Sequence, residues 1–129
     1  MHFLAEGLDT MTSGDFQTVL ADLAVESWRF ANEYRRLVSR MDANEQTRFI
    51  GKLNYFARRV ESCLAQADLK LVDLKGQSYD MGMAADVLNL DEYSPGDELV
   101  IEQMLEPPII GPSGIVRTGK ALVKRAGCK

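Results

Sequence analysis

The segment from Gly114 to Ala121, GIVRTGKA, comes closest in this sequence to a known ligand-binding motif. It nearly matches the phosphate-binding loop of nucleotide hydrolases, in which a second glycine is followed by Lys and then by Ser or Thr. Ala121 stands where that loop needs a hydroxyl to bind magnesium, and β-branched residues fill the loop interior. Only eight residues follow Ala121, too few for the rest of a nucleotide fold. We therefore expect a strand here and no nucleotide cofactor.

Other side chains that could do chemistry also lack the necessary partners. The only histidine is His2, which excludes histidine-based triads and metal sites. Cys63 and Cys128 have no histidine to activate them and are too few for a thiolate zinc site. The acid pairs at 91–92 and 97–98 fit no calcium-binding loop and are best interpreted as solvated turns. The sequence predicts a protein that is not an enzyme, with no catalytic residue, metal or cofactor.

The composition is that of an ordinary globular protein. The chain has 129 residues, of which 46% are hydrophobic and 26% charged, and a formal net charge of −4. The acidic excess argues against a nucleic-acid partner. No apolar run approaches the roughly 20 residues of a membrane span, and residues 1–7 lack the basic start of a signal peptide. Two cysteines indicate no disulfide framework, so we expect a cytoplasmic protein.

The N-terminal half carries two helical apolar seams, in which the steps between apolar residues alternate between four and three. The first begins near residue 15 and is interrupted only by Ser27, and the second ends at Ala67. Between them, Asp42 and Glu45 fit a helix-capping box. The seams predict two helices of about 26 and about 22 residues. Their main positions are Phe16, Leu20, Leu23, Phe30, Tyr34, Leu37, Met41, Phe49, Leu53, Phe56, Val60 and Cys63.

Two amphipathic helices cannot enclose both of their own apolar stripes. Either the C-terminal half covers the stripes or a second copy of the chain does, and the continuous seam favours a second copy. We therefore expect residues 1–68 to form a dimerisation region, a four-helix bundle across a two-fold axis. The dimerisation residues would be Phe16, Leu20, Leu23, Phe30, Tyr34, Leu37, Phe49, Leu53 and Phe56. The arginines of both helices are interpreted chiefly as a solvated face.

The C-terminal half, residues 69–129, reads as short strands separated by Pro/Gly turns. We expect strands at 69–74, 86–90, 98–105, 115–117 and 120–124, with a turn at 93–97. The segment 107–113 is expected to be a loop that exposes Ile109 and Ile110. These elements predict a small antiparallel sandwich or half-barrel, and the whole chain belongs to the α+β class.

Charge is unevenly distributed along this half. No Lys or Arg occurs between Lys75 and Arg117, whereas eight acids do, and the residues after Arg117 include bases and no acid. These charges either keep loops and strand edges solvated or form a basic stripe beside an acidic sheet, oriented for a charged partner.

Five features of the C-terminal half, in this order and spacing, resemble the GrpE family. They are VDLKGQSYD at 72–80, Val87, the turn Pro95-Gly96, Leu99-Val100 and GIVRTGKALV at 114–123. The last is similar to the family's closing Gly-x-Val-Leu-Arg-Pro-Ala strand. The chain departs from the family at Met81, at Ala84-Ala85 and at Thr118-Gly119, and it lacks a long N-terminal coiled coil. It looks like a diverged member.

The resemblance implies a nucleotide-exchange factor, a co-chaperone that binds a DnaK-type chaperone ATPase as a homodimer and promotes ADP release. It implies that the β domain holds the nucleotide-binding lobes of the ATPase open. A GrpE-shaped adaptor that docks without exchange is the alternative, and a small-molecule binder or enzyme that uses the acidic sheet is a more distant one. The expected partner-binding residues are Ile109, Ile110, Gly114, Ile115, Arg117, Val123 and Lys124.

Overall fold

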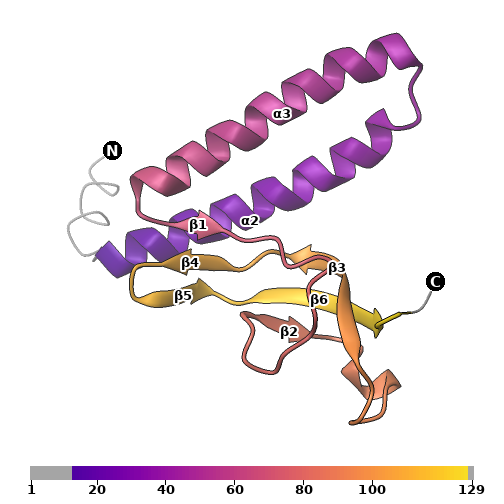
Figure 1. Cartoon of the computed structure of the whole chain (residues 1–129). Coiled ribbons are helices and arrows are strands. Elements are labelled where there is room, and N and C mark those ends of the chain that lie inside the picture. The colour runs from indigo at the N-terminus through magenta and orange to yellow at the C-terminus, as the bar shows by residue number, and fades with distance from the viewer. Residues whose placement is uncertain (1–12, 128–129) are drawn as a thin grey trace.

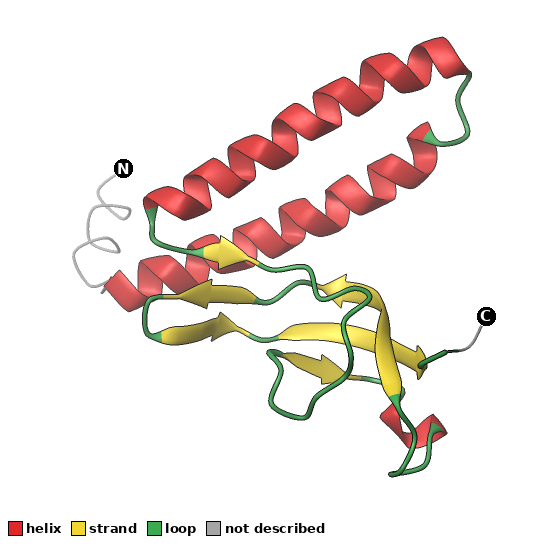
Figure 2. Ribbon diagram, in the orientation of Figure 1, coloured by secondary structure: helices red, strands yellow, loops and turns green. Residues whose placement is uncertain are grey.

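The computed structural model describes residues 13–127 and shows a helical hairpin followed by a β region, an α+β fold (Figures 1 and 2). Helix α2 spans Ser13–Val38 and helix α3 spans Ala43–Gln66. The side chain of Asp42 accepts a hydrogen bond of 3.0 Å from the backbone N–H of Glu45, which confirms the predicted cap of α3. Both helices have the positions and nearly the lengths that the seams predicted.

The β region contains two three-stranded sheets. The first has the order β1-β4-β5, with β1 at Lys70–Leu71, β4 at Ile109–Gly111 and β5 at Gly114–Arg117. The second has the order β2-β6-β3, with β2 at Ala85–Val87, β6 at Gly119–Arg125 and β3 at Leu99–Glu106. A 3-10 turn, η1, occupies Leu90–Glu92. The chain passes from β5 directly into β6, so one extended segment joins the two sheets (Figure 1).

Four predictions for the β region are wrong in detail. The segment 107–113 is not a loop, because β4 lies within it and pairs with both β1 and β5. The strand expected at 69–74 is only two residues long, and the one expected at 86–90 ends at Val87. The β region is not purely antiparallel either, because β2 runs parallel to β6. Short strands carry too few residues for their period to reveal such pairings.

Two apolar clusters hold the molecule together. The first joins the hairpin to the first sheet and contains Ala21, Ala24, Val25 and Leu64 of the helices with Leu69 and Ile109. The second joins buried residues of β3 and β6 to Leu74, and Trp28 of α2 packs against it. Helix α2 therefore contacts both sheets, while the end of the hairpin that carries the turn projects beyond the strands (Figure 1).

Candidate functional site

One face of the hairpin is apolar and uncovered. Residues of α2 spaced by seven stand exposed along it, with 62% of Leu23, 67% of Phe30 and 57% of Leu37 accessible to solvent. The alternate seam positions, Leu20 and Tyr34 among them, are only partly exposed. The α2 seam is thus divided lengthwise: one half is largely covered, and the other half remains more than half exposed within residues 13–127. A contiguous exposed apolar strip of this kind marks an interaction surface.

Helix α3 extends the same face. Tyr34 stacks on Phe30 and meets Phe49 edge-on, each pair with ring centroids 6.3 Å apart, so aromatic contacts run from one helix to the other. Phe56 and Cys63 follow Phe49 at steps of seven and are exposed. We call the combined surface the open face. It consists of Phe16, Val19, Leu23, Phe30, Leu37, Phe49, Phe56 and Cys63.

Not every predicted dimerisation residue is on the open face. Leu53 is buried and therefore unavailable to a second copy. Leu20 is partly buried because it packs against the first cluster. Phe16, Leu23, Phe30, Leu37 and Phe56 are exposed, and Tyr34 and Phe49 lie at intermediate exposure.

Two of the predicted partner-binding residues are in the core instead. Ile109 is fully buried, because β4 places it beneath the hairpin in the first cluster, so the expectation of an exposed apolar loop is wrong for this residue. Val123 is 2% exposed and packs in the second cluster with Leu99 and Ile101. Neither side chain is accessible to a partner in this structure.

The Arg117 side chain forms ion pairs within the chain. Its guanidinium donates hydrogen bonds of 2.8 Å to Asp22 of α2 and 2.8 Å to Glu106 at the end of β3. The side chain of Glu106 is 11% exposed, and Lys120 at 3.7 Å and Arg29 at 3.8 Å also approach it. This network joins α2 to β3, β5 and β6. Arg117 was expected to meet a charged partner, and the structure instead pairs it with two carboxylates of its own chain.

The remaining predicted partner-binding residues divide between two places. Gly114 and Ile115 are exposed and Ile110 is partly exposed, all around the β4–β5 turn. Lys124 is exposed near the other end of the continuous β5–β6 segment (Figure 1). These four residues therefore do not form a single contact area.

Two exposed leucines, Leu88 and Leu90, were not predicted from the sequence, and Asn89 between them binds Val123, the residue before Lys124. The Asn89 side chain donates to the backbone carbonyl of Val123 and accepts from its N–H, at 2.9 Å each. These two hydrogen bonds to β6 hold Asn89 in place. Its neighbours Leu88 and Leu90 are both exposed. The strand expected at 86–90 would place Asp86, Leu88 and Leu90 on one face, and this period was the sequence signal that could have found them.

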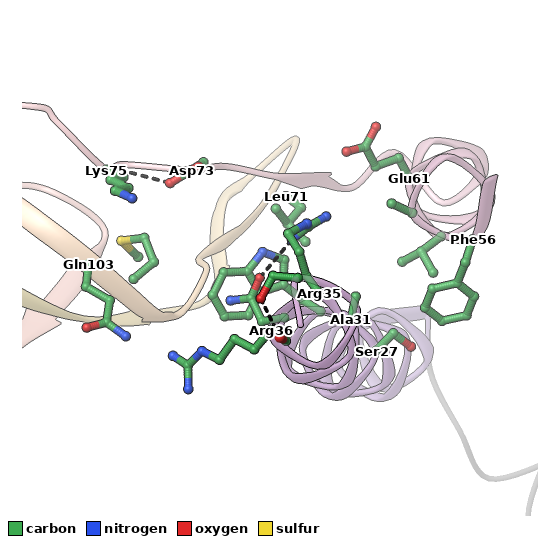
Figure 3. Close-up of a pocket in the computed structure, with 16 residues that line it drawn as sticks. Ser27, Ala31, Arg35, Arg36, Phe56, Glu61, Leu71, Asp73, Lys75 and Gln103 are labelled. Atoms are coloured by element: carbon green, nitrogen blue, oxygen red, sulfur yellow. Dashed lines mark hydrogen bonds between the residues drawn. The ribbon is translucent and has the colours of Figure 1, made fainter. Parts of the chain in front are cut away.

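An open groove of about 810 Å³ lies between the hairpin and the β region (Figure 3). Phe56 and Glu61 lie on one side of it and Lys75 and Gln103 on the other. Arg35 is held by a hydrogen bond of 3.1 Å to Asn32. The groove brings together no nucleophile with a base. Among residues 13–127, no three His, Cys, Asp or Glu side chains are close enough to hold a metal ion.

Neither helix contains a stretch long and apolar enough to cross a membrane, within the described part of the chain. Comparison with protein-family models, with curated proteins and with solved structures finds no match for this chain.

Proposed function

We propose that this protein is a homodimeric, GrpE-like nucleotide-exchange factor that binds a DnaK-type chaperone ATPase and promotes ADP release. The observation that carries the proposal is the open face: a heptad-spaced apolar strip on a hairpin, followed in the chain by a separate β region. This is the order of parts that the family resemblance implies. A second copy covering the open face makes a four-helix bundle.

The contact with the ATPase belongs to the β region. Leu88 and Leu90 supply two exposed apolar side chains and Lys124 of β6 supplies a cation, and the Asn89 hydrogen bonds to Val123 tie these two segments together. A surface fixed in advance loses little conformational freedom on binding. We place the contact here rather than at the β4–β5 turn, because the first cluster and the hairpin flank that turn.

The mechanism requires no bond chemistry in this chain. A partner that binds the open arrangement of the ATPase lobes more tightly than the closed one shifts the equilibrium toward the open arrangement. The open lobes make fewer contacts with ADP, so its release becomes faster. By reciprocity, bound ADP weakens the affinity of the ATPase for this protein by the same factor.

Release of fluorescently labelled ADP from a DnaK-type ATPase tests the proposal, with and without this protein. We expect acceleration by the parent, a loss of at least tenfold in Leu88→Asp, and little change in the control Ile115→Asp at the β4–β5 turn. If Ile115→Asp abolishes acceleration and Leu88→Asp does not, the contact lies at the turn. Binding without acceleration would identify an adaptor, and no binding to any DnaK-type ATPase would refute the proposal.

A further inference from the structure

The groove between the hairpin and the β region has an apolar interior (Figure 3). Trp28 and Ala31 line it from α2, and Leu71 and Met104 line it from the β region. Leu71 packs against the first cluster, and Trp28 packs against the second cluster, to which Met104 belongs. The apolar surface of the groove therefore lies where the margins of the two clusters meet.

The groove is elongated along α2. Its lining residues on this helix run from Ser27 to Ser39, a length of about 18 Å at the helical rise per residue. Trp28 and Ala31 lie toward the β region, whereas Arg35 lies toward the hairpin turn that projects beyond the strands (Figure 1). The volume of about 810 Å³ falls within the range of small-molecule sites, about 300–1,000 Å³. This shape suits a long, narrow ligand better than a compact one.

An interruption in backbone pairing opens the groove on the side of the β region. The N–H of Val72 donates to the Pro108 carbonyl at 3.1 Å, and the N–H of Gly76 donates to the Ile101 carbonyl at 2.8 Å. Three residues separate Val72 from Gly76, but six separate Ile101 from Pro108. Within residues 13–127, no backbone hydrogen bond joins these two unequal stretches. Their members that line the groove are Asp73, Lys75, Gln103 and Met104.

Two cations that line the groove have no acidic partner in the part of the chain that the structure describes. Arg35 comes from α2 and Lys75 from the β region (Figure 3). No carboxylate within residues 13–127 lies within 4.0 Å of the charged group of either side chain. Arg35 donates a hydrogen bond of 3.1 Å to the neutral side chain of Asn32. Both cations are therefore available to an anionic ligand.

The other charged residues of the lining limit the charge of that ligand. Arg36 lies 3.7 Å from Glu33, but both side chains are mostly exposed, so this pair is weak. The Asp73 carboxylate accepts a hydrogen bond of 2.9 Å from the backbone N–H of Lys75, and Glu61 adds a second negative charge. Three cations and two carboxylates leave the lining with a net charge of +1. This excess matches a monoanion such as a carboxylate better than a dianion such as a phosphate.

We propose that this groove binds an organic monoanion with a long apolar chain, a carboxylate of the fatty-acid class. Its chain lies along Trp28 and Ala31, and its carboxylate lies between Arg35 and Lys75. A guanidinium pairs with a carboxylate through two parallel hydrogen bonds, which favours this head group. The inference does not rest on the proposed function. Among the residues that line the groove, only Phe56 belongs to the open face, so a second copy on that face leaves the groove accessible.

Titration with decanoate, below its micellar concentration, tests the inference. The indole N–H resonance of Trp28, the single tryptophan, should shift on binding, and calorimetry gives the Kd. Each buried methylene strengthens binding by up to about fourfold, so decanoate should bind about four- to fifteenfold more tightly than octanoate. Decanol has the same chain without the charge and should bind at least tenfold more weakly than decanoate. Equal binding of decanol and decanoate, or of acetate and decanoate, would refute the inference.

Removal of the two unpaired cations gives a second, independent result. Arg35→Ala/Lys75→Ala should weaken decanoate binding at least tenfold and leave decanol binding unchanged, and added salt should weaken decanoate binding by the parent only. The control Arg58→Ala/Lys70→Ala makes the same charge change outside the groove and should bind decanoate as the parent does. All four side chains are exposed, so both variants should fold. If Arg35→Ala/Lys75→Ala binds decanoate as tightly as the parent, or if a short glutamate-rich peptide shifts the Trp28 resonance and decanoate does not, the inference is wrong.

Discussion

Arg117→Ala should destabilise the fold rather than weaken a partner contact. Glu106 is almost buried, and Arg117 supplies its closest positive charge, at 2.8 Å. Removing one member of a buried ion pair leaves the other desolvated without compensation, and that typically costs about 3–5 kcal/mol. The same substitution also removes the ion-pair partner of Asp22, a residue of α2.

The magnitude follows from what remains around Glu106. Lys120 at 3.7 Å and Arg29 at 3.8 Å still compensate part of its charge, and both are about half exposed. We therefore expect a loss at or below the lower limit of that range, about 2–3 kcal/mol. The Asp22 pair adds less than about 1 kcal/mol, because its carboxylate is 60% exposed. The expected total is about 3 kcal/mol.

Urea unfolding at fixed protein concentration measures this loss, with the fluorescence of the single tryptophan, Trp28, as the signal. A double-mutant cycle with Glu106→Gln should return a coupling energy of about 2 kcal/mol. The control Lys124→Ala removes an exposed cation and should change stability by less than about 0.5 kcal/mol. If Arg117→Ala is as stable as the parent and instead loses binding to the ATPase, Arg117 is a contact residue and the reasoning from the network is refuted.

Three further substitutions test the assignments of buried and open positions. Val123→Asp places a carboxylate in the second cluster and should unfold the β region, seen as lost amide dispersion in NMR spectra, whereas the neighbouring Lys124→Asp should remain folded. Leu23→Asp combined with Leu37→Asp should give a folded monomer by sedimentation, since both side chains are exposed in the single chain; an unchanged dimer would exclude the open face as its interface. Gly119→Ala should lower the free energy of unfolding by about 1–3 kcal/mol, because a Cβ there would lie 2.7 Å from the Glu106 carbonyl oxygen and 2.8 Å from Pro108. Gly96→Ala serves as the control, since a Cβ at Gly96 would meet no atom within 4 Å.

The helical half could be predicted from sequence because its information is local. The heptad spacing and the Asp42 cap lie within a few residues of the structure that they specify, and α2 and α3 have the expected positions. The division of the seam into a covered and an open half was not predictable, because it depends on where α3 and the β region pack.

The β region was less predictable because its contacts are distant in sequence. Asn89 binds β6 from 34 residues away, and Asp22 reaches Arg117 across 95 residues. No pattern among neighbouring residues of the sequence specifies contacts between residues so far apart in the chain. Val123 is different, since the alternation of Lys120, Ala121, Val123 and Lys124 along β6 already places Val123 opposite the lysines. The family resemblance assigned Val123 to the partner contact, and the strand period would have assigned it to the core.

The ion network around Glu106 connects the two interaction surfaces that we propose. Asp22 of α2 pairs with Arg117 of β5, and Arg29 of α2 pairs with Glu106 of β3, so rotation of the β region about the hairpin would break these ion pairs. In the dimer that we propose, the network would therefore hold both copies of Leu88, Leu90 and Lys124 in a fixed orientation relative to the open face. Weakening the network should thus reduce binding even though none of its residues touches the partner.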